Sequence, residues 1–381
     1  MTPVVLEGRL VLPDRVLERG QVVLEGCQIV EVVMEAGRYP ATLDYGESYL
    51  APGFIDLHAH GIAGANVMDA SVDSLRLVAR RVAARGATSF LPSTVTAGTA
   101  VLRGVIECVR RVMDEPGDDE SRVLGVHLEG PWISTAFKGA QNEAFIEPPR
   151  VEAARELLEV APGTVRRVSL APELPGSEDL ARALIAAGVL VSIAHTGATY
   201  EQTIAAAELG ASHVTHCFNG MSGFHHRAPG VAGGAMLRDD LFVELIPDGL
   251  HVHPGAMELL IRVKGRERVM LVTDSMAATE LNDGVYSLGG KEVFVRGGDA
   301  RLADGTLASS TLTMDRAVRE LVTRCAVSLV DAVFMAATTP AIAIGLGSSL
   351  GALRPGYVAD LVVLGTDLNA QATWVAGRRL G

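Results

Sequence analysis

The 381-residue sequence lacks several features that define common classes of protein. Its cysteines form no Cys-X-X-Cys pair, which argues against a disulfide frame or a zinc knot. The four are Cys27, Cys108, Cys217 and Cys325. No apolar run is long enough to span a bilayer, and the first residues contain no signal-like apolar core. We therefore expect a soluble, cytoplasmic protein with reduced thiols and no membrane partner.

Positive charge is also scarce. The formal net charge is −12, and the only lysines are Lys138, Lys264 and Lys291. This balance argues against a nucleic-acid-binding surface, and an anionic substrate would need a local basic cluster. No Gly-X-Gly-X-X-Gly motif follows a first strand, so an open doubly wound sheet is only the second choice for the fold.

From residue 53 onward, short apolar runs alternate with helical stretches. The runs that predict strands are GFIDLHAH, TSFLPST, RVLGVHLEG, RRVSLAPE, VLVSIAHTG, HVTHCFN, FVELIPDGLHV and RVMLVTDS. Strands that are apolar along their length are typical of a parallel sheet covered on both faces. Eight β–α alternations over about 250–300 residues have the size of a (β/α)8 barrel. Residues 284–310 predict a Gly-rich hairpin before a helix at 313–324, and a second helix is expected at 329–337.

Both ends of the chain favour short strands with glycine breaks. VVLEGRLVL and QVVLEGCQIVEVV alternate apolar and polar residues, and the tail returns to this pattern in VADLVVLG and ATWVAGRRL. We expect an α/β protein in which residues 53–348 form the TIM-like barrel. Residues 1–52 and 349–381 would together form a small β-sandwich domain.

Residues that can bind metal recur at the carboxyl ends of the predicted strands. His58 and His60 are one residue apart, so in a strand both imidazoles point to the same side. Other strand ends contribute His127, Glu129, His195, His216, His251, His253 and Asp274. Taken singly, each of these histidines is explained equally well as a metal ligand or as a hydrogen-bonded residue that is buried or at the rim. Together, at the face of a barrel that carries the active site, they favour a metal site.

Asp274 ends the apolar run RVMLVTD. A carboxylate in such a place is costly unless it is paired, hydrogen-bonded or linked to a metal. We interpret Asp274 as a general base for a water that a metal activates. The alternative is the N-cap of a following helix.

Several motifs, taken in order, resemble the amidohydrolase superfamily, and within it the N-acetylglucosamine-6-phosphate deacetylases. They are GFIDLHAHG, HLEGPW, AHTGA, HCFNGM, DGLHVHP, LVTDSMAAT, SSTLTMDRAV and LRPGYVADLVVL. The resemblance implies metal-dependent hydrolysis of N-acetylglucosamine 6-phosphate to glucosamine 6-phosphate and acetate, in amino-sugar catabolism or cell-wall recycling. The alternatives are the galactosamine epimer as substrate, another amidohydrolase activity, or a non-catalytic barrel scaffold.

The same resemblance implies roles for individual residues. Glu129, His195 and His216 match the main metal ligands, and Asp274 matches the catalytic acid/base. His58 and His60 match a pair that holds a second metal in some members, with Glu129 bridging. The implied cofactor is one or two divalent ions of zinc, iron, manganese or cobalt. The implied substrate-binding residues are Ala140, Gln141, Asn219, Gly220, Arg227, His251, Leu307, Ala308 and Ser309. The residue matching Arg227 reaches into the neighbouring subunit's site, which implies a homodimer.

Three departures from the pattern stand out. None of the lysines lies where many superfamily members have a bridging modified lysine, so Glu129 would have to serve. Gln141 stands where some members have a histidine that polarises the acetyl carbonyl. Gly220 replaces a common alanine, a change that a backbone N–H contact to substrate would survive.

Overall fold

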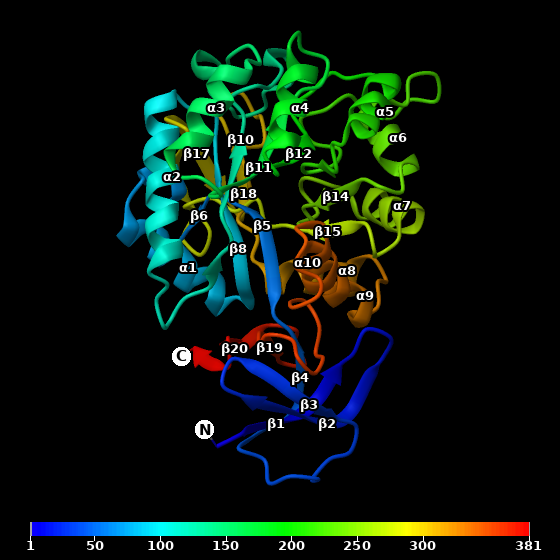
Figure 1. Ribbon diagram of the computed structural model, residues 1–381. Helices are drawn as coiled ribbons and strands as arrows, with labels where there is room; N and C mark the ends of the chain where they lie inside the picture. Colours follow the sequence, from blue (N-terminus) through cyan, green and yellow to red (C-terminus); the bar gives the residue numbers. More distant parts are fainter. Residues whose placement is uncertain (1, 381) are drawn as a thin grey trace.

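The computed structural model describes residues 2–380 and consists of a barrel above a smaller β domain (Figure 1). Parallel strands follow one another in the order β15-β14-β13-β12-β11-β10-β8-β5, and β9 (Arg122–Val123) pairs with β8. Their bounds are β5 Phe54–Ala59, β8 Ala87–Thr94, β10 Val126–Glu129, β11 Val165–Leu170, β12 Leu190–Ile193, β13 His213–Val214, β14 Phe242–Leu245 and β15 Val269–Leu271. Each strand coincides with one of the eight predicted runs, although β8 and β11 each begin one residue earlier, and the (β/α)8 barrel is confirmed.

Backbone hydrogen bonds between β5 and the segment after β15 close the barrel. The amide of Asp274 donates to the carbonyl of His58, and the amide of His60 donates to the carbonyl of Ser275, each at 2.8 Å. The carboxyl ends of the first and last barrel strands therefore lie side by side. This closure brings residues more than 200 positions apart in the chain into one site.

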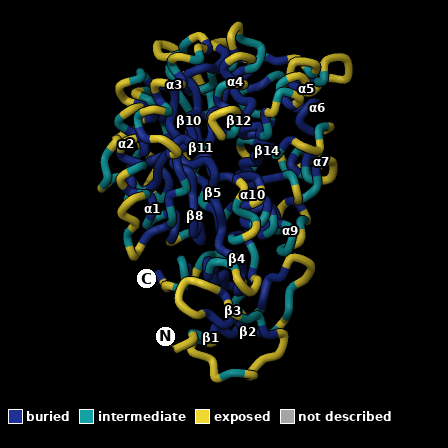
Figure 2. The backbone as a smooth tube through the Cα atoms, viewed as in Figure 1, coloured by how far each residue is buried: buried dark blue, intermediate teal, exposed yellow. Residues whose placement is uncertain are grey.

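Helices cover the outside of the barrel, and the strands form its buried centre (Figure 2). The helices are α1 Val72–Ala84, α2 Thr99–Asp114, α3 Val151–Val160, α4 Ser177–Ala186, α5 Tyr200–Leu209, α6 Gly230–Leu237, α7 Pro254–Lys264, α8 Met314–Arg324, α9 Leu329–Val333 and α10 Thr339–Ala343. In α1, the buried residues Leu75, Val78, Ala79 and Val82 recur at helical spacing, and Ser71 caps the first turn. Within residues 2–380, no helix has both the length and the apolar character needed to cross a membrane.

Helix α6 has no clear signal in the sequence, because three of its eight residues are glycine. Glycine disfavours a helix interior by about 1 kcal/mol relative to alanine. Seven of the eight residues are buried, and tertiary packing stabilises the helix despite this propensity. The expected helix at 329–337 is also longer than predicted, since it continues through a π-helical turn, Phe334–Thr338, into α10. Pro340 lies within this continuous helix, just after the π-helical turn, and cannot donate a helical N–H bond there.

The two chain ends form a seven-stranded sheet in the order β21-β20-β19-β4-β1-β2-β3. The bounds are β1 Val4–Val11, β2 Val16–Glu25, β3 Gln28–Val33, β4 Leu43–Pro52, β19 Leu361–Leu364, β20 Ala370–Val375 and β21 Arg378–Leu380. Leu6, Leu24, Leu50, Leu361 and Trp374 belong to one buried cluster, so strands from both ends enclose a common core. The small β domain built from both ends is confirmed.

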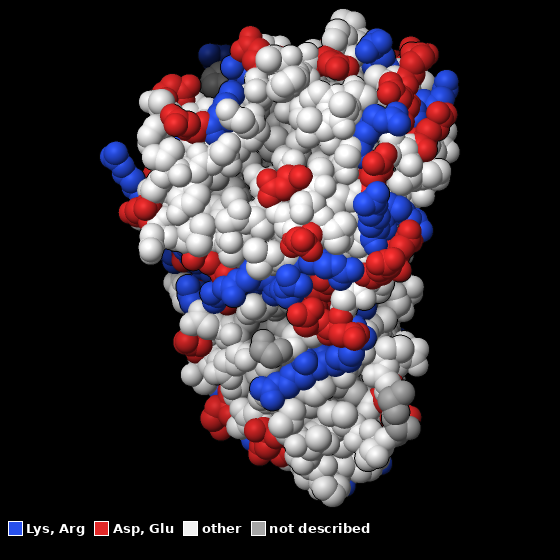
Figure 3. Space-filling view, turned by 90° about the vertical axis from the view of Figure 1, so that its left-hand side faces the viewer, with Lys and Arg blue, Asp and Glu red and all other residues white. Residues whose placement is uncertain are grey.

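The small domain is joined to the barrel by a close backbone approach and by ion pairs. Gly53 links β4 to β5, and a Cβ at this position would lie 2.2 Å from the side chain of Thr88. The Arg122 guanidinium lies 2.8 Å from the buried carboxylate of Asp360 in the small domain. On the face seen in Figure 3, basic and acidic side chains lie next to each other across the middle of the molecule.

The predicted hairpin insertion is a three-stranded antiparallel sheet of β16 Gly284–Leu288, β17 Lys291–Arg296 and β18 Asp299–Arg301. The Lys291 ammonium donates to the carbonyl of Gln141 at 2.9 Å, which ties this sheet to the loop after β10. Two short strands, β6 Gly61–Ile62 and β7 Ala65–Asn66, form a second small hairpin directly after β5. Both hairpins therefore lie beside the carboxyl end of the barrel.

Candidate active site

A cavity opens at the carboxyl end of the barrel, and most of the predicted site residues line it. They are His60, Glu129, Ala140, Gln141, His195, His216, Asn219, Gly220, His251, Asp274, Leu307 and Ser309. These residues come from the ends of six barrel strands and from the loop after the hairpin insertion. The polar residues at the carboxyl ends of the predicted strands therefore indicated where the cavity lies.

Three predicted residues lie outside the lining of this cavity. His58 is fully buried beside His60, and its ring nitrogen faces the same cluster. Ala308 is fully buried between the lining residues Leu307 and Ser309. Arg227 is exposed, and its guanidinium contacts His226 at 3.1 Å.

Glu129, His195 and His216 form the first of two buried groups. Oε1 of Glu129 lies 3.2 Å from Nε2 of His195 and 3.0 Å from Nε2 of His216. The two Nε2 atoms are 3.3 Å apart. Burial opposes ionisation of Glu129, but His58 and these two histidines hold its pKa well below the ordinary value.

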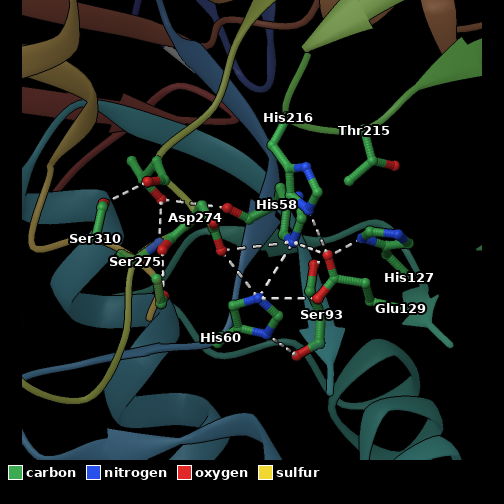
Figure 4. A network of polar contacts seen from close by, with 12 residues as sticks. His58, His60, Ser93, His127, Glu129, Thr215, His216, Asp274, Ser275 and Ser310 are labelled. Atoms are coloured by element: carbon green, nitrogen blue, oxygen red, sulfur yellow. Dashed lines mark hydrogen bonds and ion pairs between the residues drawn. The ribbon is translucent and has the colours of Figure 1, made fainter. Parts of the chain in front are cut away.

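His58, His60 and Asp274 form the second group, which adjoins the first (Figure 4). The Nε2 atoms of His58 and His60 are 3.1 Å apart, and Oδ1 of Asp274 lies 3.0 Å from Nε2 of His60. Oε2 of Glu129 is 3.5 Å from the same atom of His60, so Glu129 faces both groups. Asp274 caps no helix and turns its carboxylate into the cluster.

Hydrogen bonds at the far side of the rings fix which nitrogen of each imidazole is protonated. Nδ1 of His60, His195 and His216 each face a backbone carbonyl, at 3.1, 2.9 and 3.1 Å. A carbonyl only accepts, so each Nδ1 donates and each neutral ring keeps its lone pair on Nε2. Nδ1 of His58 likewise faces Oε2 of Glu244 at 3.0 Å.

Four Nε2 lone pairs and two carboxylates therefore converge on one small volume. Such lone pairs repel one another unless a cation lies between them, and imidazole with carboxylate suits first-row divalent metals. The outer contacts of Nδ1 are those that orient metal-binding histidines. The donor set fits the expected metal, and it offers two adjacent groups of ligands.

His127 and His253, which also end predicted strands, have structural roles. His127 is fully buried, with Nδ1 near the Arg167 guanidinium and Nε2 bonded to Ser169 at 2.8 Å. Burial and the charge of Arg167 hold its pKa well below the ordinary value. His253 instead caps the N-terminus of α7 by accepting from the amide of Gly255. These two histidines are therefore hydrogen-bonded structural residues, the alternative considered for every strand-end histidine in the sequence.

The sequence profile of the amidohydrolase family matches residues 49–380. The chain belongs to the amidohydrolase family. It is 39% identical to N-acetylglucosamine-6-phosphate deacetylase of Vibrio furnissii, over 90% of this chain and 85% of that protein. It is 40% identical to N-acetylgalactosamine-6-phosphate deacetylase of Escherichia coli, over 86% and 87% of the two chains.

Among solved structures, this amidohydrolase is similar to a mutant of N-acetyl-D-glucosamine-6-phosphate deacetylase from Mycobacterium smegmatis in complex with N-acetyl-D-glucosamine-6-phosphate. The TM-score is 0.95 at 35% identity, and the match covers 100% of both chains. The enzyme of the same name from Thermotoga maritima matches with a TM-score of 0.89 at 32% identity, over 100% of this chain and 99% of that one. The similarity therefore extends over the barrel and the small β domain together.

Two buried residues of the site, Glu244 and Arg167, were not predicted from the sequence. Glu244 on β14 bonds Nδ1 of His58 and accepts from the amide of His216 at 3.0 Å, so it contacts both groups. Its Oε1 lies 2.5 Å from Nη2 of Arg167, and both side chains are fully buried. The signal was present, because Glu244 interrupts an apolar strand run as Asp274 does.

Gly220 explains one of the departures from the family pattern. It has a φ of +57°, and a Cβ there would lie 2.8 Å from Nδ1 of His195. The missing side chain leaves room for the imidazole and for its bond to the carbonyl of Phe137. Three residues of the cluster also adopt left-handed φ, namely 43° at His195, 30° at His216 and 50° at Asp274.

Proposed function

We propose that this amidohydrolase is a metal-dependent deacetylase that hydrolyses N-acetylglucosamine 6-phosphate to glucosamine 6-phosphate and acetate. The observation that carries the proposal is the convergence of four Nε2 lone pairs and two carboxylates at the floor of the cavity. Deacetylases of N-acetylglucosamine 6-phosphate at 35–39% identity over most of the chain support this choice of substrate.

Two divalent ions fit the donor set better than one. Glu129, His195 and His216 would hold the first, and His58 and His60 would hold the second, with Glu129 between them. Three buried carboxylates surround these sites, namely Glu129, Asp274 and Glu244, and of these the buried Arg167 pairs with Glu244 alone. The excess negative charge needs cations. Zinc, iron, manganese and cobalt all suit these ligands.

When bound, the metal supplies Lewis-acid activation of water and of the acetyl carbonyl. Asp274 accepts the proton of the attacking water and returns it to the amine that leaves. Its position beside His60 and at the cavity wall suits both transfers. Nε2 of His60 lies 3.0 Å from Oδ1 of Asp274 and 3.1 Å from Nε2 of His58, so these contacts keep Asp274 within the cluster. The burial of the cluster excludes bulk water from these groups.

The sugar phosphate is bound by His251, Asn219 and the backbone at Gly220. Burial lowers the pKa of His251, but Asp248 at 2.7 Å outweighs it and raises that pKa. His251 is therefore suited to face an anion. None of the described residues that line the cavity is lysine or arginine. We propose that Arg227 of a second subunit supplies a guanidinium that binds the phosphate, which implies a homodimer.

We place the reaction in the cytoplasm, where a reducing environment suits four free cysteines. Residues 53–348 would form the hydrolase unit, and residues 1–52 and 349–381 the small domain. Ala140, Leu307, Ala308 and Ser309 complete the proposed substrate-binding residues, and Ala308 is fully buried between Leu307 and Ser309, which line the cavity. Gln141 lines the same cavity, with its side-chain amide bonded to Glu129.

The galactosamine epimer is the second candidate substrate, because one relative at 40% identity carries that name. The test is metal quantitation beside kcat/KM for both epimers and for unphosphorylated N-acetylglucosamine. We expect the glucosamine epimer to be preferred and the unphosphorylated sugar to react poorly. Equal turnover of the unphosphorylated sugar would contradict the phosphate-binding residues, and a higher kcat/KM for the other epimer would reassign the substrate.

A further inference from the structure

Gln141 lines the cavity, yet its side-chain amide is directed at Glu129. Oε1 of Gln141 accepts the backbone N–H of Thr96 at 2.7 Å, and Nε2 donates to Oε2 of Glu129 at 2.6 Å. The N–H of Thr96 only donates, so the amide oxygen must face it and the NH2 group must face Glu129. At 6% exposure, Gln141 is shielded from water that would compete for these bonds.

The two oxygens of Glu129 face different histidines. Oε1 lies 3.0 Å from Nε2 of His216 and 3.5 Å from Nε2 of His58, whereas Oε2 lies 3.5 Å from Nε2 of His60. The terminal torsion of a glutamate is broad, so the carboxylate plane is not fixed by its own rotamer. The bond from Gln141 to Oε2 restrains that plane. Because an amide is neutral, it does so without cancelling the negative charge that a cation needs.

We propose that Gln141 is a positioning residue that sets the plane of the Glu129 carboxylate, so that Oε1 faces His195 and His216 while Oε2 faces His60. The proposal rests on the proposed function in so far as both groups hold metal. It assigns the amide of Gln141 to Glu129 and not to the acetyl carbonyl of the substrate. The two roles predict opposite results in two measurements.

The first measurement is metal affinity. Full-length protein is stripped of metal and titrated with Co²⁺, whose visible spectrum reports coordination, in competition with a chelator. Gln141→Ala should weaken Co²⁺ binding by about 10- to 100-fold, as is typical when the partner of a metal ligand is lost. Gln141→His keeps a ring N–H donor and should recover part of the affinity.

The second measurement is turnover at saturating Co²⁺. A positioning role predicts that Gln141→Ala regains kcat to within a few-fold of wild type once the metal sites are full. Polarisation of the carbonyl predicts unchanged Co²⁺ affinity and a kcat lowered about 10²–10³-fold at every metal concentration. That second pattern would overturn the proposal.

Asn142→Ala is the matched control. Asn142 is the neighbouring amide and lines the same cavity, but its Nδ2 contacts the carbonyl of Gly289 at 3.4 Å and not Glu129. It should keep wild-type Co²⁺ affinity, and an equal loss in both variants would attribute the effect to loop packing and refute the proposal. Co²⁺ affinity needs no substrate, so a protein without deacetylase activity would contradict the proposed function while leaving this result readable.

Discussion

Replacing Glu244 by glutamine leaves Arg167 as an uncompensated charge in the barrel interior. Both side chains are fully buried and their nearest atoms are 2.5 Å apart. Breaking a buried pair from one side costs about 3–5 kcal/mol. Burial opposes ionisation of Glu244, but Arg167 and His58 lower its pKa from 4.5 to about 2. This shift corresponds to about 3 kcal/mol at neutral pH, to which Arg167 and His58 both contribute.

The assay is urea unfolding of chelator-treated protein at pH 7, followed by two spectroscopic probes. Glu244→Gln should lower the free energy of unfolding by about 3–5 kcal/mol, and Arg167→Met by a similar amount. The double variant should lose less than the two singles together, because neither charge is then left alone. Since the folded pKa is depressed, this stabilisation is complete above pH 4.5 and disappears as the pH falls towards 2.

The exposed pair Glu178 and Arg182 provides the control. Their side chains are 71% and 61% exposed, so Glu178→Gln should change stability by no more than about 1 kcal/mol. If Glu244→Gln behaved like Glu178→Gln, or if the double variant were additive, the pairing of Glu244 with Arg167 would not stabilise the barrel.

Three further predictions concern the cluster and the phosphate. His58→Ala combined with His60→Ala should remove one of the two proposed ions, measured by elemental analysis; unchanged metal content would exclude the second site. Asp274→Asn should lower kcat about 10²–10⁴-fold while metal stays bound to the group around Glu129, and near-normal turnover would rule out its acid/base role. Arg227→Ala should raise KM for the phosphorylated sugar, and mixing Arg227→Ala with Asp274→Asn subunits should restore activity in hybrid dimers. A mixture that stays inactive would mean that Arg227 does not act across an interface.

The barrel and the cavity could be predicted because their signals are local. Each barrel strand is a short apolar run, and the residues at its carboxyl end follow it directly in the sequence. His58 and His60 are paired by the two-residue period of one strand. The same local criterion overlooked Glu244, which was grouped with the apolar residues of its run although a carboxylate there needs a partner.

Contacts between distant strands could not be predicted in this way. His58 and Glu244 are separated by 186 residues, and only closure of the barrel brings them together. The bond between Gln141 and Glu129 depends on the fold of the loop after β10 and on the backbone of Thr96. Helix α6 was missed for a related reason, since burial by neighbouring elements stabilises a glycine-rich segment with poor intrinsic propensity.

The left-handed backbone at His195, His216 and Asp274 has a consequence for the evolution and engineering of this protein. Each such residue costs roughly 1–2 kcal/mol relative to glycine, which adopts this conformation freely. Substitutions to glycine at these positions would relieve strain and remove the chemistry at once. The strained backbone therefore persists because turnover is selected together with stability, and the surrounding barrel must supply the free energy that these three residues cost.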